Sequence, residues 1–278
     1  MTTTTAADGV LYEAIKSPAA YVAAYNALME EPSNRLRVRA VTDMLRRVGP
    51  GVRRVIDVAS GGGAYTGPAR AVLGEGVRFF PVDRQLACVT GYRLNHPAAR
   101  PALADVTALP FARGAFELAL CLDIIEHLDD DVAFLRGIEQ LLVPNGWVVI
   151  STHNRRSIEH LLGLAKSAVT GETWRGWDPT HIRFYDGPSL ERLLSAAGFE
   201  QVAVSGTYYW PFHFPARVAS WPFERLGLRR LGSLVYRAVV APGYALNAAL
   251  ESGSQALGLR TLGWGIIALG RKTGPRSA

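Results

Sequence analysis

Three aspartates lie where a polar ligand could be bound, because each stands in or at the end of an apolar run. Asp57 lies within VIDVA, Asp83 ends VRFFPVD and Asp105 lies in RPALADV. Glycines occupy positions 61–63, after the first acid, and glycine accepts a positive φ and lets a ligand touch the backbone. Asp83 stands 20 residues after Gly63, a spacing at which an acid accepts hydrogen bonds from a ribose diol. These residues predict a nucleotide-like site.

The first acid argues against a dinucleotide in this site. A dinucleotide turn has the pattern GxGxxG, with its diphosphate at the N-terminus of the next helix. In this chain Thr66 occupies the third glycine position of that pattern. The Asp57 carboxylate beneath the turn would repel a diphosphate, whereas it would suit a cation such as the ammonium group of a methionine moiety.

Alternating strands and helices must position these acids. After two helices within 18–48, near-continuous apolar strands separated by helices are expected. The strands cover 53–59, 77–83, 100–106, 115–123 and 146–152, and two more follow later. Apolar strands of this kind indicate a parallel sheet covered on both faces, with ligands at the carboxyl ends of its strands. We therefore expect an α/β fold: a doubly wound, seven-stranded, mostly parallel, Rossmann-like sheet with helical lid insertions.

The chain divides into six segments on this pattern. They are an N-terminal helical cap (1–48), a ligand-binding core (49–152), a lid insertion (153–186), a continuation of the core (187–206), an aromatic and then helical insertion (207–262) and a final core strand (263–272). Both insertions leave the sheet at or beside its carboxyl ends. We expect them to cover the part of the site where a second substrate would bind.

Composition and charge restrict the class of protein. The chain has 278 residues, 49% of them hydrophobic, and a net charge of +6. Its arginines are scattered and no RNA-reading motif accompanies them, so a nucleic-acid partner is not expected. Cys88 and Cys121 form no CxxC pair, the N-terminus shows no apolar signal segment, and Arg237 and Pro242 interrupt the apolar stretch 231–250. We expect a reduced, cytoplasmic protein without a membrane span.

Five successive motifs carry a family resemblance. VIDVASGGG, FFPVDRQ, ADVTALPF, LALCLDIIEHLDD and LLVPNGWVVIST resemble, in order and spacing, the motifs of class I S-adenosylmethionine-dependent methyltransferases. Within that class the chain is most similar to the O-methyltransferases of ubiquinone biosynthesis and related small-molecule enzymes. One position departs from the pattern, since Ala59 stands where the family's first loop glycine is expected; a slightly shifted turn should still bind the cofactor.

The resemblance implies the residues that hold S-adenosylmethionine. Asp57 and the backbone from Ala59 to Gly63 would hold the methionine part, Asp83 the ribose, and Asp105 with Val106 the adenine. Arg37 would face the cofactor carboxylate, with an exposed helix charge as the alternative. The full expected set is Arg37, Asp57, Ala59, Ser60, Gly61, Gly63, Asp83, Arg84, Asp105, Val106 and Leu122.

Methyl transfer to an oxygen or nitrogen acceptor also requires removal of a proton. The expected catalytic residues are His181, His127 and His153, which stand beyond the fourth and fifth strands. By resemblance to metal-binding members of the class, Asp123, Glu126, His127 and His181 could hold a divalent metal. Metal-free members share the EHL segment, however, and in them Glu126 would cap the next helix while His127 packs near the acceptor.

These residues predict a methyltransferase that acts on an apolar or aromatic small molecule. O-methylation is favoured, in natural-product, quinone or lipid biosynthesis. Three alternatives stay open: an RNA 3′-end methyltransferase, a non-catalytic S-adenosylmethionine-binding partner protein and a nicotinamide oxidoreductase. The aromatic insertion has two further interpretations. It could contact a membrane peripherally, or it could form the interface of a homodimer.

Overall fold

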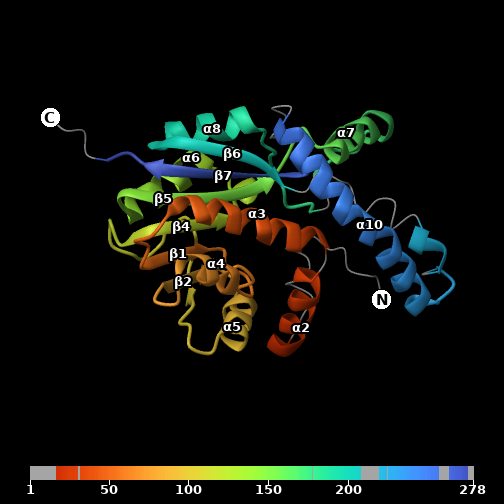
Figure 1. Cartoon of the computed structure of the whole chain (residues 1–278), viewed down its shortest axis with the longest axis horizontal. Helices are drawn as coiled ribbons and strands as arrows, with labels where there is room; N and C mark the ends of the chain where they lie inside the picture. Colours follow the sequence, from red (N-terminus) through yellow and green to blue (C-terminus); the bar gives the residue numbers. More distant parts are fainter. Residues whose placement is uncertain are drawn as a thin grey trace.

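A seven-stranded sheet forms the centre of the molecule (Figure 1). The computed structural model describes residues 17–30, 32–176, 178–207, 219–223, 225–256 and 263–274. The strands are β1 (Arg54–Val58), β2 (Arg78–Asp83), β3 (Ala102–Leu103), β4 (Phe116–Leu122), β5 (Leu142–His153), β6 (Phe199–Thr207) and β7 (Gly265–Lys272). Their order is β3-β2-β1-β4-β5-β7-β6, and β7 runs antiparallel to both of its neighbours. This arrangement confirms the predicted fold class.

Helices cover both faces of the sheet (Figure 1). The described helices are α2 (Pro18–Met29), α3 (Pro32–Val48), α4 (Thr66–Leu73), α5 (Leu86–Asn95), α6 (Asp131–Leu141), α7 (Ile158–Thr170), α8 (Gly187–Ala196) and α10 (Arg229–Ala256), and η1 (Ile125–His127) is a 3₁₀ turn. Of these, α7 and α10 project away from the sheet (Figure 1). Both helices predicted within 18–48 are present as α2 and α3. None of the helices in the described ranges is long and apolar enough to cross a membrane.

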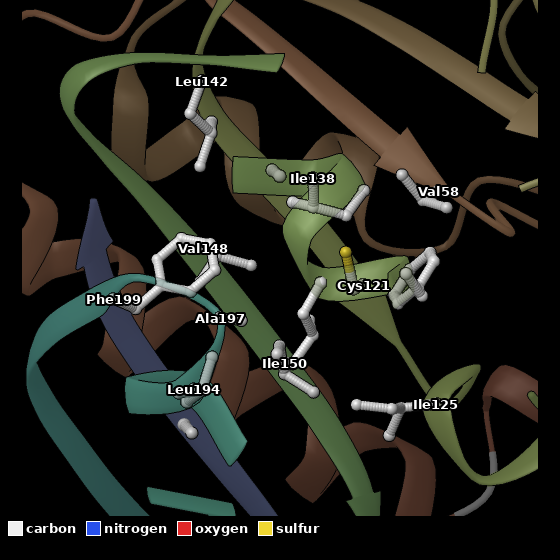
Figure 2. Close-up of a cluster of buried hydrophobic side chains, with 14 of the residues drawn as sticks. Val58, Cys121, Ile125, Ile138, Leu142, Val148, Ile150, Leu194, Ala197 and Phe199 are labelled. Carbon is white, nitrogen blue, oxygen red and sulfur yellow. The ribbon is translucent and has the colours of Figure 1, made fainter. Parts of the chain in front are cut away.

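Two apolar layers hold the helices against the sheet. Ile138 of α6 and Leu194 of α8 pack on one face, against Cys121 and Ile150 (Figure 2). Leu45 of α3 packs on the other face, in a cluster whose members also come from α4, β1, β4 and β7. Burial of apolar side chains on both faces explains why the central strands read as almost continuous apolar runs.

The boundary between α6 and β5 differs from the expectation. The sequence predicted a helix to residue 142 and a strand from 146, whereas β5 starts at Leu142, directly after α6. Asn145 adopts a φ of 64° inside this strand, and the pairing with β4 shifts register between Phe116 and Leu118. Such an irregularity bends the strand without ending it, so the strand begins earlier than the predicted residue 146.

The carboxyl ends of β1, β2 and β4 meet at one edge of the sheet. The parallel register pairs Asp57 with Pro81 of β2 and with Leu120 of β4, so the three strands end at about the same height. The N-terminal helix α2 lies beside this edge, because its Tyr21 and Tyr25 pack with Cys88 of α5 in a small buried cluster. The fold therefore places the predicted acids together and covers them from the N-terminal side.

Candidate active site

A cavity of about 720 Å³ lies at this edge of the sheet. Ligand sites in proteins commonly measure about 300–1,000 Å³, so the space is large enough for a nucleoside-containing ligand. Ten of the eleven residues expected to bind the cofactor line its wall. They are Arg37, Asp57, Ala59, Ser60, Gly61, Asp83, Arg84, Asp105, Val106 and Leu122.

Asp57 is a buried carboxylate in the floor of the cavity. Only 3% of the residue is exposed, and no side-chain hydrogen bond to it is formed by the part of the chain that the structure describes. Burial, with the nearby Asp83 carboxylate, raises the pKa of Asp57 to about 7. Two acids placed so closely, one without a protein donor, form a site that a cation would stabilise.

Asp83 links the second strand to the turn after the first. Its Oδ2 accepts a hydrogen bond from the Gly61 N–H (3.1 Å), and its Oδ1 accepts one from the Gln85 N–H (2.9 Å). Burial raises its pKa, while these two donors act in the opposite direction. Each carboxylate oxygen retains a further lone pair, so Asp83 can still accept hydrogen bonds from a ligand hydroxyl.

The three glycines have two different roles. Gly61 lines the cavity, but Gly62 and Gly63 do not. A Cβ added to Gly62 would lie 2.5 Å from Cδ1 of Tyr25, and one added to Gly63 would lie 2.7 Å from atoms of Tyr92 and His96. The absence of side chains at positions 62–63 therefore makes room for aromatic side chains of the protein itself. Gly63 was expected to contact the cofactor, but it does not line the cavity.

The turn also presents an unused hydroxyl. Ser60 is 6% exposed and lines the cavity, and its Oγ has no hydrogen-bond partner within the described residues. Its backbone is held by a hydrogen bond from the Ser60 N–H to the Val82 carbonyl oxygen (3.0 Å). A buried hydroxyl without a partner is uncommon and costly, so a polar ligand at the turn would satisfy it.

Ala59 carries backbone strain at the position where the family pattern has glycine. Its φ is 57°, in the left-handed region that costs a residue with a Cβ about 1–2 kcal/mol. Asp123, at the end of the neighbouring β4, also has a positive φ of 52°. Both residues line the cavity, and such strain persists where the surrounding structure holds a site in place.

The Ala59→Gly substitution should raise the free energy of unfolding by about 1 kcal/mol, because glycine adopts the left-handed conformation without a Cβ clash. Urea denaturation of the ligand-free protein measures the change. Ala71→Gly is the matched control: Ala71 is exposed within α4, where glycine should lower the free energy of unfolding by up to about 1 kcal/mol. Equal destabilisation by both substitutions would contradict the strain at Ala59.

Asp105 and Val106 form the part of the wall that follows β3. The Oδ1 of Asp105 accepts hydrogen bonds from the backbone N–H and from the hydroxyl of Thr107, at 2.8 and 2.7 Å. These two bonds lower the pKa of the Asp105 carboxyl. The other oxygen of Asp105 can accept a hydrogen bond from the edge of a planar base. The apolar side chain of the neighbouring Val106 can pack against the face of that base.

Arg37 reaches the cavity from α3 and pairs with an acid. Its Nη1 lies 2.6 Å from Oδ2 of Asp123, and Asp123 Oδ1 accepts a hydrogen bond from the Ser151 hydroxyl (2.9 Å). Both charged side chains are largely buried. Arg37 is therefore not an exposed helix charge, and its ion pair closes the wall between the N-terminal helices and the end of β4.

Of the three candidate catalytic histidines, only His127 lines the cavity. His153 stands behind it, with its Nδ1 3.1 Å from Oε1 of the fully buried Glu126. His181 is buried between them, its ring centroid 4.9 Å from that of His127 and 4.5 Å from that of His153. Burial and the neighbouring His153 lower the pKa of His181 to about 4, so His181 is neutral at physiological pH.

The four residues expected to hold a metal are not brought together as one set. Asp123 is engaged by Arg37 and Ser151 and belongs to neither group of converging donors in the described ranges. Those groups are Glu126, His153 and His181, and His127, Asp178 and His181, with atoms within 4.8 Å of one another. Both oxygens of Glu126 already accept hydrogen bonds, from His153 and from the Thr152 hydroxyl. The donor set predicted from the sequence therefore does not fit the structure.

The sequence did not reveal several residues of the wall. Tyr25, Leu28 and Met29 come from α2, and Thr180 comes from the segment between α7 and α8. A helix face in the N-terminal cap carries no local pattern that distinguishes a ligand contact from packing. Thr180 stands directly before the candidate catalytic residue His181, and this adjacency is the signal in the sequence that indicates it.

The two insertions contribute unequally to the cavity. Thr180 belongs to the segment 153–186, whereas no described residue of 207–262 lines the wall. Most of the aromatic stretch of the second insertion, residues 208–218, lies outside the described residues. The N-terminal helices α2 and α3 also contribute to the wall, through Leu28 and Arg37 among others.

Comparisons with known proteins find similar sequences and similar structures. Residues 21–204, more than half of the chain, match a family model described as a methyltransferase domain. The ubiquinone biosynthesis O-methyltransferase of Idiomarina loihiensis is 29% identical over 172 residues, which are 57% of this chain and 66% of that protein. The enzyme of the same name from Thiobacillus denitrificans is 26% identical over 183 residues, or 64% and 76% of the two chains.

The match to the first of these relatives spans slightly less than two thirds of that protein's length. Among solved structures, an S-adenosylmethionine-dependent methyltransferase from Thermotoga maritima is similar with a TM-score of 0.58 and 14% sequence identity. That alignment covers 91% of this chain and 97% of the other. At such low identity the likeness shows the shared fold.

Proposed function

The chain belongs to the methyltransferase-domain family, as the resemblance in its motifs predicted, and from this premise we propose that it methylates a hydroxyl group of an apolar or aromatic small molecule. The methyl donor is S-adenosylmethionine. The observation that supports this function best is the composition of the cavity wall. The wall carries Asp57, Asp83 and Asp105, and it also carries His127 and several apolar side chains.

The acidic part of the cavity suits each group of the proposed donor. Asp57 would face the ammonium group and Asp83 the ribose diol, while Asp105 and Val106 would border the adenine. The unpartnered Ser60 hydroxyl offers a hydrogen-bond donor for the carboxylate. When bound, S-adenosylmethionine supplies a methyl group that is already activated by the sulfonium charge, so the protein has to position the two reactants and remove a proton.

The part near His127 suits an apolar acceptor. Ile124 and Leu128 lie at the two ends of η1, next to His127, and Leu28, Met29 and Phe134 line the same cavity. A pocket with these side chains would bind a planar or hydrocarbon-rich molecule, as small-molecule sites generally do. His127 is the histidine of this wall, and we assign it the role of general base that takes the proton from the acceptor hydroxyl.

Donor binding should weaken as the pH falls below about 7. The ligand-free Asp57 has its pKa raised to about 7 by burial and by Asp83, and only the ionised carboxylate balances the donor's ammonium group. The protonated form dominates at lower pH, so affinity should fall about fivefold from pH 7 to pH 6 and about tenfold for the next unit. Isothermal titration calorimetry across this range measures it. Asp57→Asn should bind weakly at every pH, and a wild-type affinity independent of pH would contradict the assignment.

A mass-shift assay tests the proposed reaction. The protein is incubated with S-adenosylmethionine and a panel of catechols, phenols and prenylated phenols, and the products are analysed by mass spectrometry. We expect a +14 Da product from at least one hydroxylated probe and none from its fully O-methylated analogue. Methylation of amines alone would contradict O-methylation, and donor binding without any product across the panel would favour a non-catalytic partner protein.

The cellular setting and pathway are part of the same proposal. We place the reaction in the cytoplasm, because both cysteines are free and buried, as expected of a protein in a reducing compartment. The names of the relatives, together with the apolar wall, support an acceptor from quinone, lipid or natural-product biosynthesis.

A further inference from the structure

His127 is connected to a buried acid through a single hydroxyl. The Thr180 Oγ1 lies 3.0 Å from His127 Nδ1 and is also hydrogen-bonded to Oδ1 of Asp178. The same Asp178 oxygen accepts the Thr180 backbone N–H at 2.8 Å, which fixes the threonine beside it. Asp178 is 3% exposed, so the chain runs from a buried carboxylate to a side chain in the cavity wall.

The direction of this chain follows from the donors available. A carboxylate accepts hydrogen bonds, and a threonine hydroxyl carries one proton. The Thr180 hydroxyl therefore donates to Asp178, and its oxygen can only accept at the other side. The hydrogen between Thr180 and His127 must then belong to the imidazole, on Nδ1. Neutral His127 is left with an unprotonated Nε2.

The segment that carries Thr180 is fixed against the turn that carries His127. The Ile182 N–H donates to the Glu126 carbonyl oxygen at 3.0 Å, one residue before His127. Arg183 donates to the Asp129 carbonyl oxygen (2.6 Å) and pairs with Asp131 (2.7 Å). The two residues that follow His181 are thus bonded to residues on both sides of His127, and these bonds hold Thr180 close to His127.

We propose that Asp178 and Thr180 are positioning residues that hold His127 in the tautomer with a free Nε2, ready to accept the acceptor's proton. This inference rests on the proposed function for its catalytic meaning. In the reaction the O–H bond of the acceptor breaks and an N–H bond forms at Nε2. The oxygen electron pair bonds to the methyl carbon, and the electrons of the sulfur–carbon bond remain on sulfur. The imidazolium charge is balanced through Thr180 by Asp178.

Nitrogen-15 spectroscopy tests the tautomer without any acceptor. The protein is labelled with ¹⁵N-histidine, and the His127 signals are assigned by their loss in His127→Gln. At a pH where the ring is neutral, we expect a protonated Nδ1 and an unprotonated Nε2 in the wild type. Thr180→Val, which keeps the shape and removes the hydroxyl, should shift the proton toward Nε2, and Thr180→Ser should restore the wild-type signals. A wild-type ring protonated on Nε2, or signals unaffected by Thr180→Val, would overturn the proposal.

Turnover measurements distinguish a positioning role of Thr180 from a role in folding. They use a probe that the mass-shift assay has identified as an acceptor. Thr180→Val should lower kcat about tenfold to a hundredfold, as loss of a supporting hydrogen bond does elsewhere, with little change in the dissociation constant of S-adenosylhomocysteine. Thr180→Ser should return kcat to within about threefold of the wild type. Failure of the serine to restore kcat would contradict the role of the hydroxyl. If no probe is methylated, the proposed function fails. The nitrogen-15 spectra still test the tautomer assignment independently of that result.

Discussion

Replacing Asp83 by alanine is expected to weaken S-adenosylmethionine binding by about 1–3 kcal/mol, or about 5-fold to 150-fold in the dissociation constant. The substitution removes the charged acceptor proposed for the ribose diol. It also frees the N–H groups of Gly61 and Gln85, which Asp83 now holds, so the turn that borders the donor loses an anchor. Isothermal titration calorimetry with S-adenosylmethionine measures the effect directly.

Two further variants separate the lost contact from a loosened turn. Asp83→Asn keeps an amide oxygen that can accept one of the two backbone N–H groups, so it should lose less affinity than Asp83→Ala. Asp43→Ala removes a partly exposed carboxylate of α3 that does not line the cavity, and it should leave affinity unchanged. An Asp83→Ala protein that folds normally and binds the donor like the wild type would refute the ribose assignment.

Replacing His127 by glutamine should lower turnover by about 10²–10⁴-fold, the usual contribution of a general base. Binding of S-adenosylhomocysteine should change little, because the three aspartates and the Ser60 turn remain. Steady-state rates with an acceptor found in the mass-shift assay, together with calorimetry, separate the two quantities.

A second histidine supplies the matched control for this experiment. His160 of α7 packs on Phe184, with ring centroids 4.4 Å apart, and does not line the cavity. His160→Gln should therefore retain wild-type turnover. A large loss of turnover in His181→Gln with none in His127→Gln would show that the base had been assigned to the wrong histidine.

The sequence predicted most of the donor site because that site depends on local features. Asp57 and Asp83 end or nearly end apolar strands, and parallel strands bring their carboxyl ends to one edge of the sheet. The same reasoning reached Asp105, which follows β3, while the family resemblance indicated Leu122 of β4. Each of these residues lies in the cavity wall. The acids could be predicted because the polar residue that ends an apolar run can be recognised in the sequence itself.

The glycine turn was harder to interpret from sequence. Gly62 and Gly63 were predicted to give a ligand access to the backbone, yet they make room for Tyr25, Tyr92 and His96. A glycine needed for close packing and a glycine needed for a ligand have the same local signature, since both simply lack a Cβ. The contacts that distinguish them come from α2 and α5, which are distant in the chain.

The acceptor side could not be predicted in detail because it is assembled from distant segments. Three histidines were equivalent candidates in the sequence. The structure distinguishes them by position, since His127 lines the cavity while His181 is buried behind it. Likewise, the ion pair between Arg37 and Asp123 joins residues 86 positions apart, and it removes Asp123 from the metal set that the motif had suggested.

Calorimetric titration of the full chain with S-adenosylmethionine tests the central claim most directly, namely that the cavity bordered by the Ser60 turn and its acids holds this donor. We predict saturable binding at one molecule per chain, displaced by S-adenosylhomocysteine, and no binding of NADH. Absence of binding at millimolar donor, or displacement of the donor by NADH, would contradict the account.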